Sequence, residues 1–97
     1  MTQERKPGWT FLTNHARVLL CVARDSGIRL RDIGASVGIT ERAAHRIISE
    51  LLAAGYITRT RNGRRNQYTI NTSLPLHDPL ARGQSVGDLL AVLARPA

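Results

Sequence analysis

Arginine is concentrated in two short segments of this chain, and its chemistry is the first indication of what the chain contacts. Thirteen of the fourteen cationic residues are arginine, against seven acidic residues, and the formal net charge is +7. Arg42 and Arg46 stand four residues apart, and four more fall within seven residues, at Arg59, Arg61, Arg64 and Arg65. The planar guanidinium group binds phosphates and guanine through paired hydrogen bonds. Both segments are therefore candidates for contact with nucleic acid.

The first segment lies in a predicted helix that runs to Ala54, with Thr40 suited to the N-cap and Gly55 to the C-cap. Its inward stripe is expected at Ala44, Ile48, Leu51 and Leu52, with Ile47 on the margin. The outward residues, expected to meet base edges or phosphates, are Thr40, Glu41, Arg42, Ala43, His45, Arg46 and Ser49. The alternative is an ordinary solvated surface, with Glu41 favouring the positive end of the helix dipole.

The second segment is predicted to be a β-hairpin. Residues 56–61 and 67–70 are rich in β-branched and aromatic side chains, and Asn62-Gly63 is a typical hairpin turn. Arg64 and Arg65, expected at the hairpin tip, fit a narrow minor groove or the phosphate backbone. The other candidates are Arg61, expected to project outward beside them, and Asn66, whose alternative role is to shape the turn. Arg29 and Arg31, at the start of an earlier helix, are further candidates for backbone contact, and the alternative for Arg31 is pairing with a nearby acid.

Four helices and this hairpin are expected to position the two arginine segments. The patterns predict helices at 14–24, 31–37, 40–54 and from Ser85 onward, and Gly38 permits the turn between the second and third. Residues 28–30 are expected to be extended and able to pair as a third strand, and Pro75 and Pro79 to hold an extended linker. The fold class is mainly α with a small β-hairpin (α+β): a winged helix-turn-helix with a C-terminal helix.

The expected organisation is a disordered basic N-terminus at 1–8, a winged helix-turn-helix at 9–72, and a linker with the last helix at 73–97. Neither a membrane span nor a signal peptide is predicted, so we expect a cytoplasmic protein. The single cysteine, Cys21, fits a reducing compartment and is expected to be a buried apolar residue. The histidines, His15, His45 and His77, fall in separate elements, which disfavours metal binding, cofactors and catalysis.

Apolar side chains beyond the predicted core suggest a homodimer. A core of this size is marginal by itself, and the last helix carries an apolar stripe at helical spacing. The predicted interface contains Trp9, Phe11, Leu20, Leu89, Leu90 and Leu93. Two-fold symmetry would space two recognition helices about 34 Å apart on a palindromic site. The alternative is that the last helix folds back over its own domain.

From Trp9 to Leu93, the sequence resembles the short winged-helix regulators of the MarR-like superfamily common in actinobacteria. The resemblance rests on 11–16 (FLTNHA), 30–33 (LRDI), 38–42 (GITER), Gly55-Tyr56 and 63–66 (GRRN). It implies a homodimeric transcriptional regulator with the third helix as recognition helix and Arg64-Arg65 in the wing. Two features depart from the family: Gly34 stands where such helices usually carry alanine, which predicts a looser second helix, and the chain is shorter than full MarR proteins. We therefore do not expect a small-molecule effector.

The predicted function is that of a sequence-specific double-stranded DNA-binding transcriptional regulator. In this interpretation the recognition helix 40–54 enters the major groove, and the arginine-rich wing 59–66 contacts the backbone or the minor groove. The alternative is a winged helix used for protein–protein contact without DNA binding. RNA is a weaker candidate, because no stacking aromatic residue falls on the predicted basic face.

Overall fold

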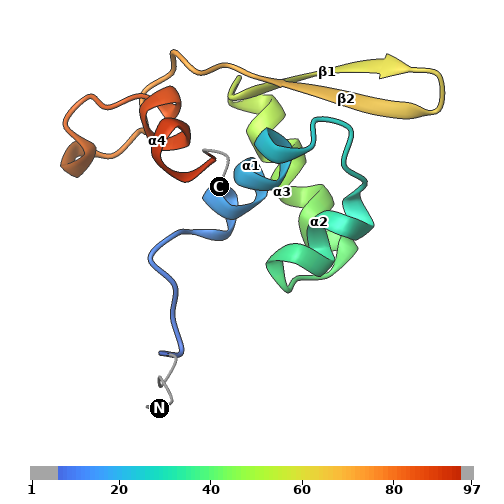
Figure 1. Ribbon diagram of the computed structural model, residues 1–97, viewed down its shortest axis with the longest axis horizontal. Helices are drawn as coiled ribbons and strands as arrows, with labels where there is room; N and C mark the ends of the chain where they lie inside the picture. The colour runs from blue at the N-terminus through green and yellow to red at the C-terminus, as the bar shows by residue number, and fades with distance from the viewer. Residues whose placement is uncertain (1–6, 95–97) are drawn as a thin grey trace.

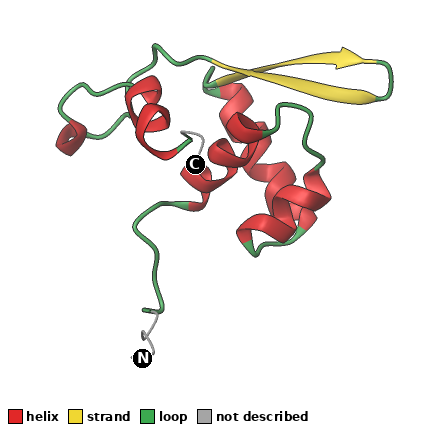
Figure 2. Cartoon of the chain, in the orientation of Figure 1, coloured by secondary structure: helices red, strands yellow, loops and turns green. Residues whose placement is uncertain are grey.

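The computed structural model describes residues 7–94, in which the four helices and the hairpin appear in the predicted order (Figures 1 and 2). The elements are α1 (Asn14–Arg24), α2 (Leu30–Val37), α3 (Glu41–Ala53), β1 (Ile57–Asn62), β2 (Arg65–Ile70), the 3-10 helix η1 (Pro79–Ala81) and α4 (Val86–Leu93). This confirms an α+β winged helix. The disorder predicted for 1–8 falls, for its first six residues, outside the described part of the chain.

The helix ends lie where local signals place them. The Thr13 and Thr40 hydroxyls accept hydrogen bonds from the amides of Ala16 and Ala43, at 3.1 and 3.0 Å, and so cap α1 and α3. At the other end of α3, Gly55 adopts φ 83° and the Tyr56 amide donates to the Leu51 carbonyl. This is the Schellman pattern, which ends the helix and turns the chain into β1.

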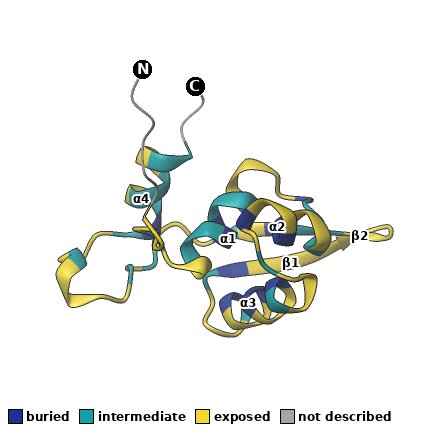
Figure 3. Cartoon of the chain, turned by 90° about the horizontal axis from the view of Figure 1, so that it is seen from below, coloured by how far each residue is buried: buried dark blue, intermediate teal, exposed yellow. Residues whose placement is uncertain are grey.

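The core lies where α1, α2, α3 and the base of the hairpin meet, and Figure 3 shows the buried surfaces of the helices turned toward one another. Its buried members are Val18, Leu19, Val22, Ile33, Val37, Ala44, Ile47, Ile48, Leu51, Ile57, Tyr68 and Val86. The predicted stripe of α3 is wrong at Ile47, which is only 2% exposed and belongs to the core, not to its margin. Leu52, predicted to face inward, is half-buried and packs against the core. The stripe that α3 buries against its neighbours is therefore rotated toward Ile47.

The predicted third strand is wrong: the sheet formed by residues 7–94 has two strands, and Leu30 already belongs to α2. Residues 25–28 form a turn instead, with the Ile28 amide donating to the Asp25 carbonyl. This turn meets the outer edge of β2 through one backbone hydrogen bond, from the Tyr68 amide to the Ser26 carbonyl at 2.9 Å. A tight turn offers no run of alternating donors and acceptors, so no ladder forms.

The hairpin is longer and its turn tighter than the sequence suggested. The register pairs Ile57 with Ile70 and continues to Asn62 with Arg65, which leaves Gly63 and Arg64 as a two-residue turn. Gly63 has φ 65°, and a glycine at the first turn position is typical of a type II′ hairpin. Figure 1 shows the hairpin projecting beyond the helices.

Gly34 does not simply loosen α2, as its identity predicted; the fold uses its lack of a side chain. A Cβ at this position would lie 2.7 Å from the Ile39 carbonyl oxygen and 3.3 Å from the Thr40 carbonyl carbon. The Gly34 carbonyl itself accepts hydrogen bonds from the amides of Gly38 and Ile39. The backbone of the turn between α2 and α3 therefore packs directly against α2.

The segment after the hairpin is a closed loop and not the extended linker that was predicted. Pro75 bridges to Ser85, the Val86 amide donates to the Leu74 carbonyl at 2.8 Å, and η1 forms between them. Ser85 and Asp88 then make the expected capping box of α4. Together these bonds set where α4 begins.

α4 lies beside α1, away from the hairpin (Figure 1). Val86 is 1% exposed and belongs to the core. At the other end of the helix, Arg24 donates from Nη2 to the Leu93 carbonyl at 3.2 Å. The start of α4 is therefore part of the domain's own packing. Within residues 7–94, no helix combines the length and the apolarity that a bilayer crossing requires.

Candidate nucleic-acid interface

The outward residues of α3 lie together, as the sequence predicted. Six of them line one shallow depression of about 570 Å³, namely Thr40, Arg42, Ala43, His45, Arg46 and Ser49. Arg42, His45 and Arg46 are exposed, while the Ala43 side chain is half-buried. Because the Thr40 hydroxyl accepts the Ala43 amide, its role as an N-cap is confirmed, and its own hydrogen remains able to donate.

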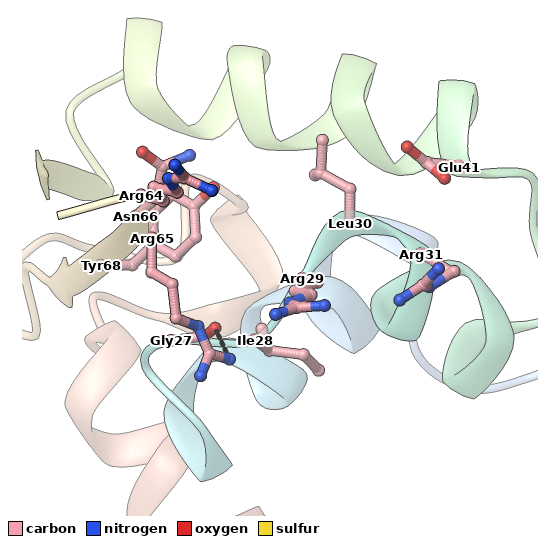
Figure 4. A pocket seen from close by; sticks show the side chains of 10 residues that line it. All are labelled: Gly27, Ile28, Arg29, Leu30, Arg31, Glu41, Arg64, Arg65, Asn66 and Tyr68. Atoms are coloured by element: carbon pink, nitrogen blue, oxygen red, sulfur yellow. Dashed lines mark hydrogen bonds between the residues drawn. The ribbon is translucent and has the colours of Figure 1, made fainter. Parts of the chain in front are cut away.

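A second hollow, of about 360 Å³, lies between the start of α2 and the hairpin (Figure 4). Its charged and polar lining consists of Arg29, Arg31, Glu41, Arg64, Arg65 and Asn66. The hollow thus brings together a helix start and a hairpin that are more than thirty residues apart in the sequence. We call it the α2–wing groove.

A third hollow joins the first two into one continuous surface. It is lined by Leu30, Glu41, Arg42 and His45. Glu41 and Leu30 also line the α2–wing groove, whereas Arg42 and His45 also line the depression on α3. The exposed face of α3, the start of α2 and the base of the wing therefore adjoin one another, and we call this surface the arginine face.

The arginine face carries an uncompensated positive charge. Arg29, Arg31, Arg42, Arg46, Arg64 and Arg65 contribute cations, and Glu41 contributes one carboxylate. In residues 7–94, the only contact of ion-pair type joins His15 Nε2 to Glu50 Oε1 at 2.7 Å, and neither residue lines these three hollows. The predicted alternative for Arg31, pairing with an acid, is therefore not found in this part of the chain. Unpaired guanidinium groups are free to bind anions.

Of the two arginines predicted at the hairpin tip, only Arg64 lies in the turn. Arg64 is exposed in the two-residue turn, but Arg65 and Asn66 belong to β2. Arg65 donates from Nη2 to the Gly27 carbonyl at 2.9 Å, and in Figure 4 its side chain runs toward Gly27. Arg61 lies across the ladder from Asn66 and is exposed. Arg64 and Arg61 are thus the predicted wing arginines for which no hydrogen bond holds the side chain within the described residues.

Arg29, which the sequence analysis paired with Arg31 as a candidate for backbone contact, is a further component of the arginine face. It is the N-cap residue of α2, makes no capping hydrogen bond through its side chain, and lines the α2–wing groove. Its proximity to Arg31 in sequence was a usable signal. What the sequence did not show was that the hairpin lies across from both.

Other groups that could perform chemistry lie apart from this surface. His15 contacts Glu50, and Cys21 lies half-buried in a separate hollow between α1 and α2. Burial raises the pKa of the Cys21 thiol above its usual value, which disfavours the reactive thiolate. Among the described residues, no group of three or more histidine, cysteine, aspartate or glutamate side chains is placed to hold a metal ion.

Comparison with known families assigns this architecture. The model of the MarR family matches residues 10–65, which is more than half of the chain and includes α1, α2, α3 and β1. The chain belongs to the MarR family. MarR proteins are DNA-binding transcriptional regulators and not enzymes, and they usually act as dimers. A search of curated proteins gives no match.

Proposed function

We propose that this MarR-family protein recognises a specific double-stranded DNA sequence by placing α3 in the major groove and the hairpin on the adjacent backbone or minor groove. The observation that supports this most directly is the continuity of the arginine face across α3, the start of α2 and the wing. A helix about 20 Å long, from its thirteen residues at about 1.5 Å each, fits the groove with its amino half toward the bases.

Within this proposal, different exposed residues of α3 contact different groups of the DNA. Arg42 and Arg46 lie on one face and can donate paired hydrogen bonds to guanine, whereas Ala43 can contact a thymine methyl group. His45 can donate to a base acceptor and Glu41 can accept from cytosine. Thr40 and Ser49 also line the depression, and their hydroxyl groups can donate to phosphate oxygens.

The test is a selection of bound duplexes from a random pool, followed by competition with the Arg46→Ala variant. If Arg46 reads a base, its loss should relax discrimination at one position by about 1–3 kcal/mol and leave other positions unchanged. Arg82→Ala is the matched control, because Arg82 is exposed beside η1, at the far side of the molecule from the wing. A selection that returns no sequence preference would overturn the proposal of specific recognition.

The proposal extends to a homodimer, because apolar side chains remain exposed in the segment before α1 and on α4. Trp9 and Phe11 stack edge to face with ring centroids 5.0 Å apart, yet they are 60% and 93% exposed. On α4, Val92 is 70% exposed, whereas Leu90 packs against the core of its own chain. The remaining predicted interface residues, Leu20, Leu89 and Leu93, are half-buried.

Light scattering after gel filtration tests the dimer. We expect twice the mass of one chain at micromolar concentration, and a lower mass for the Phe11→Ser variant, since exposed aromatic residues are typical interface anchors. A palindromic selected site with half-site centres about 34 Å apart would agree with two-fold symmetry. A single-chain mass at all concentrations would refute the dimer. A regulator of this kind acts on the chromosome, so the proposal places the protein in the cytoplasm.

The second candidate function, a winged helix for protein contact alone, makes a different prediction for salt. DNA binding through the arginine face should weaken steeply as salt rises, because each neutralised phosphate releases counterions. A protein-contact module would show no binding to labelled duplex even at low salt. Titration of duplex at several salt concentrations therefore distinguishes the two functions.

A further inference from the structure

The α2–wing groove contains two kinds of arginine. Arg65 is held within the molecule by its hydrogen bond to the Gly27 carbonyl. Arg29, Arg31 and Arg64 are exposed and, in the described part of the chain, make no hydrogen bond through their side chains. One arginine of the groove therefore has a structural role, and the other three are available to bind an anion.

The one acid of the groove is at its α3 end. In Figure 4, Glu41 lies at the start of α3 and Arg31 in the first turn of α2, Arg29 stands between them and the hairpin, and Arg64 lies on the hairpin. An anion at the α3 end would meet a carboxylate, whereas an anion between Arg29 and Arg64 would face guanidinium groups from both sides. The part of the groove between Arg29 and Arg64 is therefore the part whose charge is complementary to an anion.

We propose that Arg29 and Arg64 together hold one phosphate group of the DNA backbone in the α2–wing groove. This inference rests on the proposed function and adds a sequence-independent site to it. Planar guanidinium forks from two directions match the tetrahedral oxygens of a phosphodiester. Such a site sets the register of the protein on the duplex and carries no sequence information by itself.

Arg65 acts in this site as a positioning residue. Three hydrogen bonds tie β2 to the turn before α2: Arg65 Nη2 to the Gly27 carbonyl, the Tyr68 amide to the Ser26 carbonyl, and the Ser26 hydroxyl to Gln67 Oε1. Arg29 follows this turn and Arg64 precedes β2. These bonds therefore fix the distance between the two arginines that bind the phosphate. Without them the hairpin would be joined to this turn by side-chain packing alone.

The experiment measures the dependence of the association constant on salt for a random-sequence duplex, using the full chain and the variants Arg29→Gln, Arg64→Gln and the double variant. If both arginines share one phosphate, the double variant should lower the slope of log K against log salt by about 0.9 per protomer. The effects of the two single substitutions on the slope should then not be additive. Arg82→Gln, on the far side of the molecule, should leave the slope unchanged, and circular dichroism confirms that each variant is folded.

Three results would overturn the inference. A double variant that lowers the slope by about 1.8 per protomer would mean two separate phosphates. An unchanged slope would mean no phosphate contact at this groove. If, with an unchanged slope, millimolar inorganic phosphate raised the melting temperature of the wild type but not of the double variant, the groove would serve a free phosphate and not DNA. Failure of the wild type to bind any duplex would instead contradict the proposed function itself.

Discussion

Replacing Gly34 with alanine should destabilise the protein, although alanine is the better helix former. Gly34 lies inside α2, where alanine is favoured over glycine by about 0.8–1.0 kcal/mol. Its missing side chain, however, faces the turn that leads into α3. The outcome depends on which of these two effects is larger.

The structure gives the size of the steric effect. An added Cβ would stand 2.7 Å from the Ile39 carbonyl oxygen, closer than the 3.0 Å below which Cβ contacts are essentially never seen. The atom that the added Cβ would meet belongs to the backbone, so it cannot move aside as a flexible side chain could. The next residue, Thr40, caps α3, so a shift of this backbone would also move the start of that helix. Forcing an extra methyl group into such a packed site costs about 1–3 kcal/mol. Subtracting the gain in helix propensity leaves a net loss of about 1 kcal/mol, which lowers the melting temperature by about 4–8 °C in a domain of this size.

Thermal unfolding followed by circular dichroism measures this effect, and Ala35→Gly is the matched control. Ala35 is exposed on the same helix, so its replacement reports helix propensity alone and should cost about 1 kcal/mol. Because the displaced turn carries the start of α3, Gly34→Ala should also weaken DNA binding more than Ala35→Gly does at a temperature where both are folded. A melting temperature that rises in Gly34→Ala would show that the turn yields freely, and would refute the argument.

Three further expectations follow from individual contacts. Replacing Arg65 with leucine should lower the free energy of unfolding in urea by about 1 kcal/mol, because a hydrogen bond to the turn is lost, whereas Arg64→Leu should not; equal effects would contradict the positioning role. The Ser85 amide and hydroxyl hold the pKa of Asp88 below its usual 3.8. The Asp88 carboxylate therefore stabilises the fold at pH values above 3.8, and this stabilisation is lost as the pH falls through the lowered pKa. The difference in melting temperature between wild type and Asp88→Asn should shrink in acid, and a pH-independent difference would rule this out. Burial raises the pKa of Cys21, so iodoacetamide should react more slowly with native than with urea-unfolded protein near neutral pH; matching rates would argue against it.

Most element boundaries could be predicted because they are set by neighbours in the sequence. Thr40, Gly55 and the Ser85–Asp88 pair satisfy backbone groups within a few residues of themselves, and the structure contains each of these caps. The outward face of α3 was predictable for the same reason. Helical periodicity alone places Arg42 and Arg46 together and away from Ala44 and Ile48.

The errors occurred where a residue's environment comes from distant segments. Residues 28–30 have the composition of a strand, but α2 begins at Leu30 and only a turn meets β2. Gly34 appeared to be a weak point of α2, yet the close approach of the Ile39 carbonyl makes its small size useful. Arg65 was expected at the wing tip, whereas the register of the hairpin places it in β2, within reach of Gly27. None of these contacts leaves a periodic or local signal.

The sequence by itself determined the order of the elements, their caps, the exposed side of α3 and the excess of arginine, since all of these depend on residue type and on spacing within a few turns. Only the tertiary structure decided that 27–31 and 64–66 face each other across one groove, and which arginines there are free. The physical reason is that packing of α2 on α3, together with the three bonds between β2 and the preceding turn, brings together residues more than thirty positions apart. Such separations are set by the folded core, and no pattern along the chain encodes them directly.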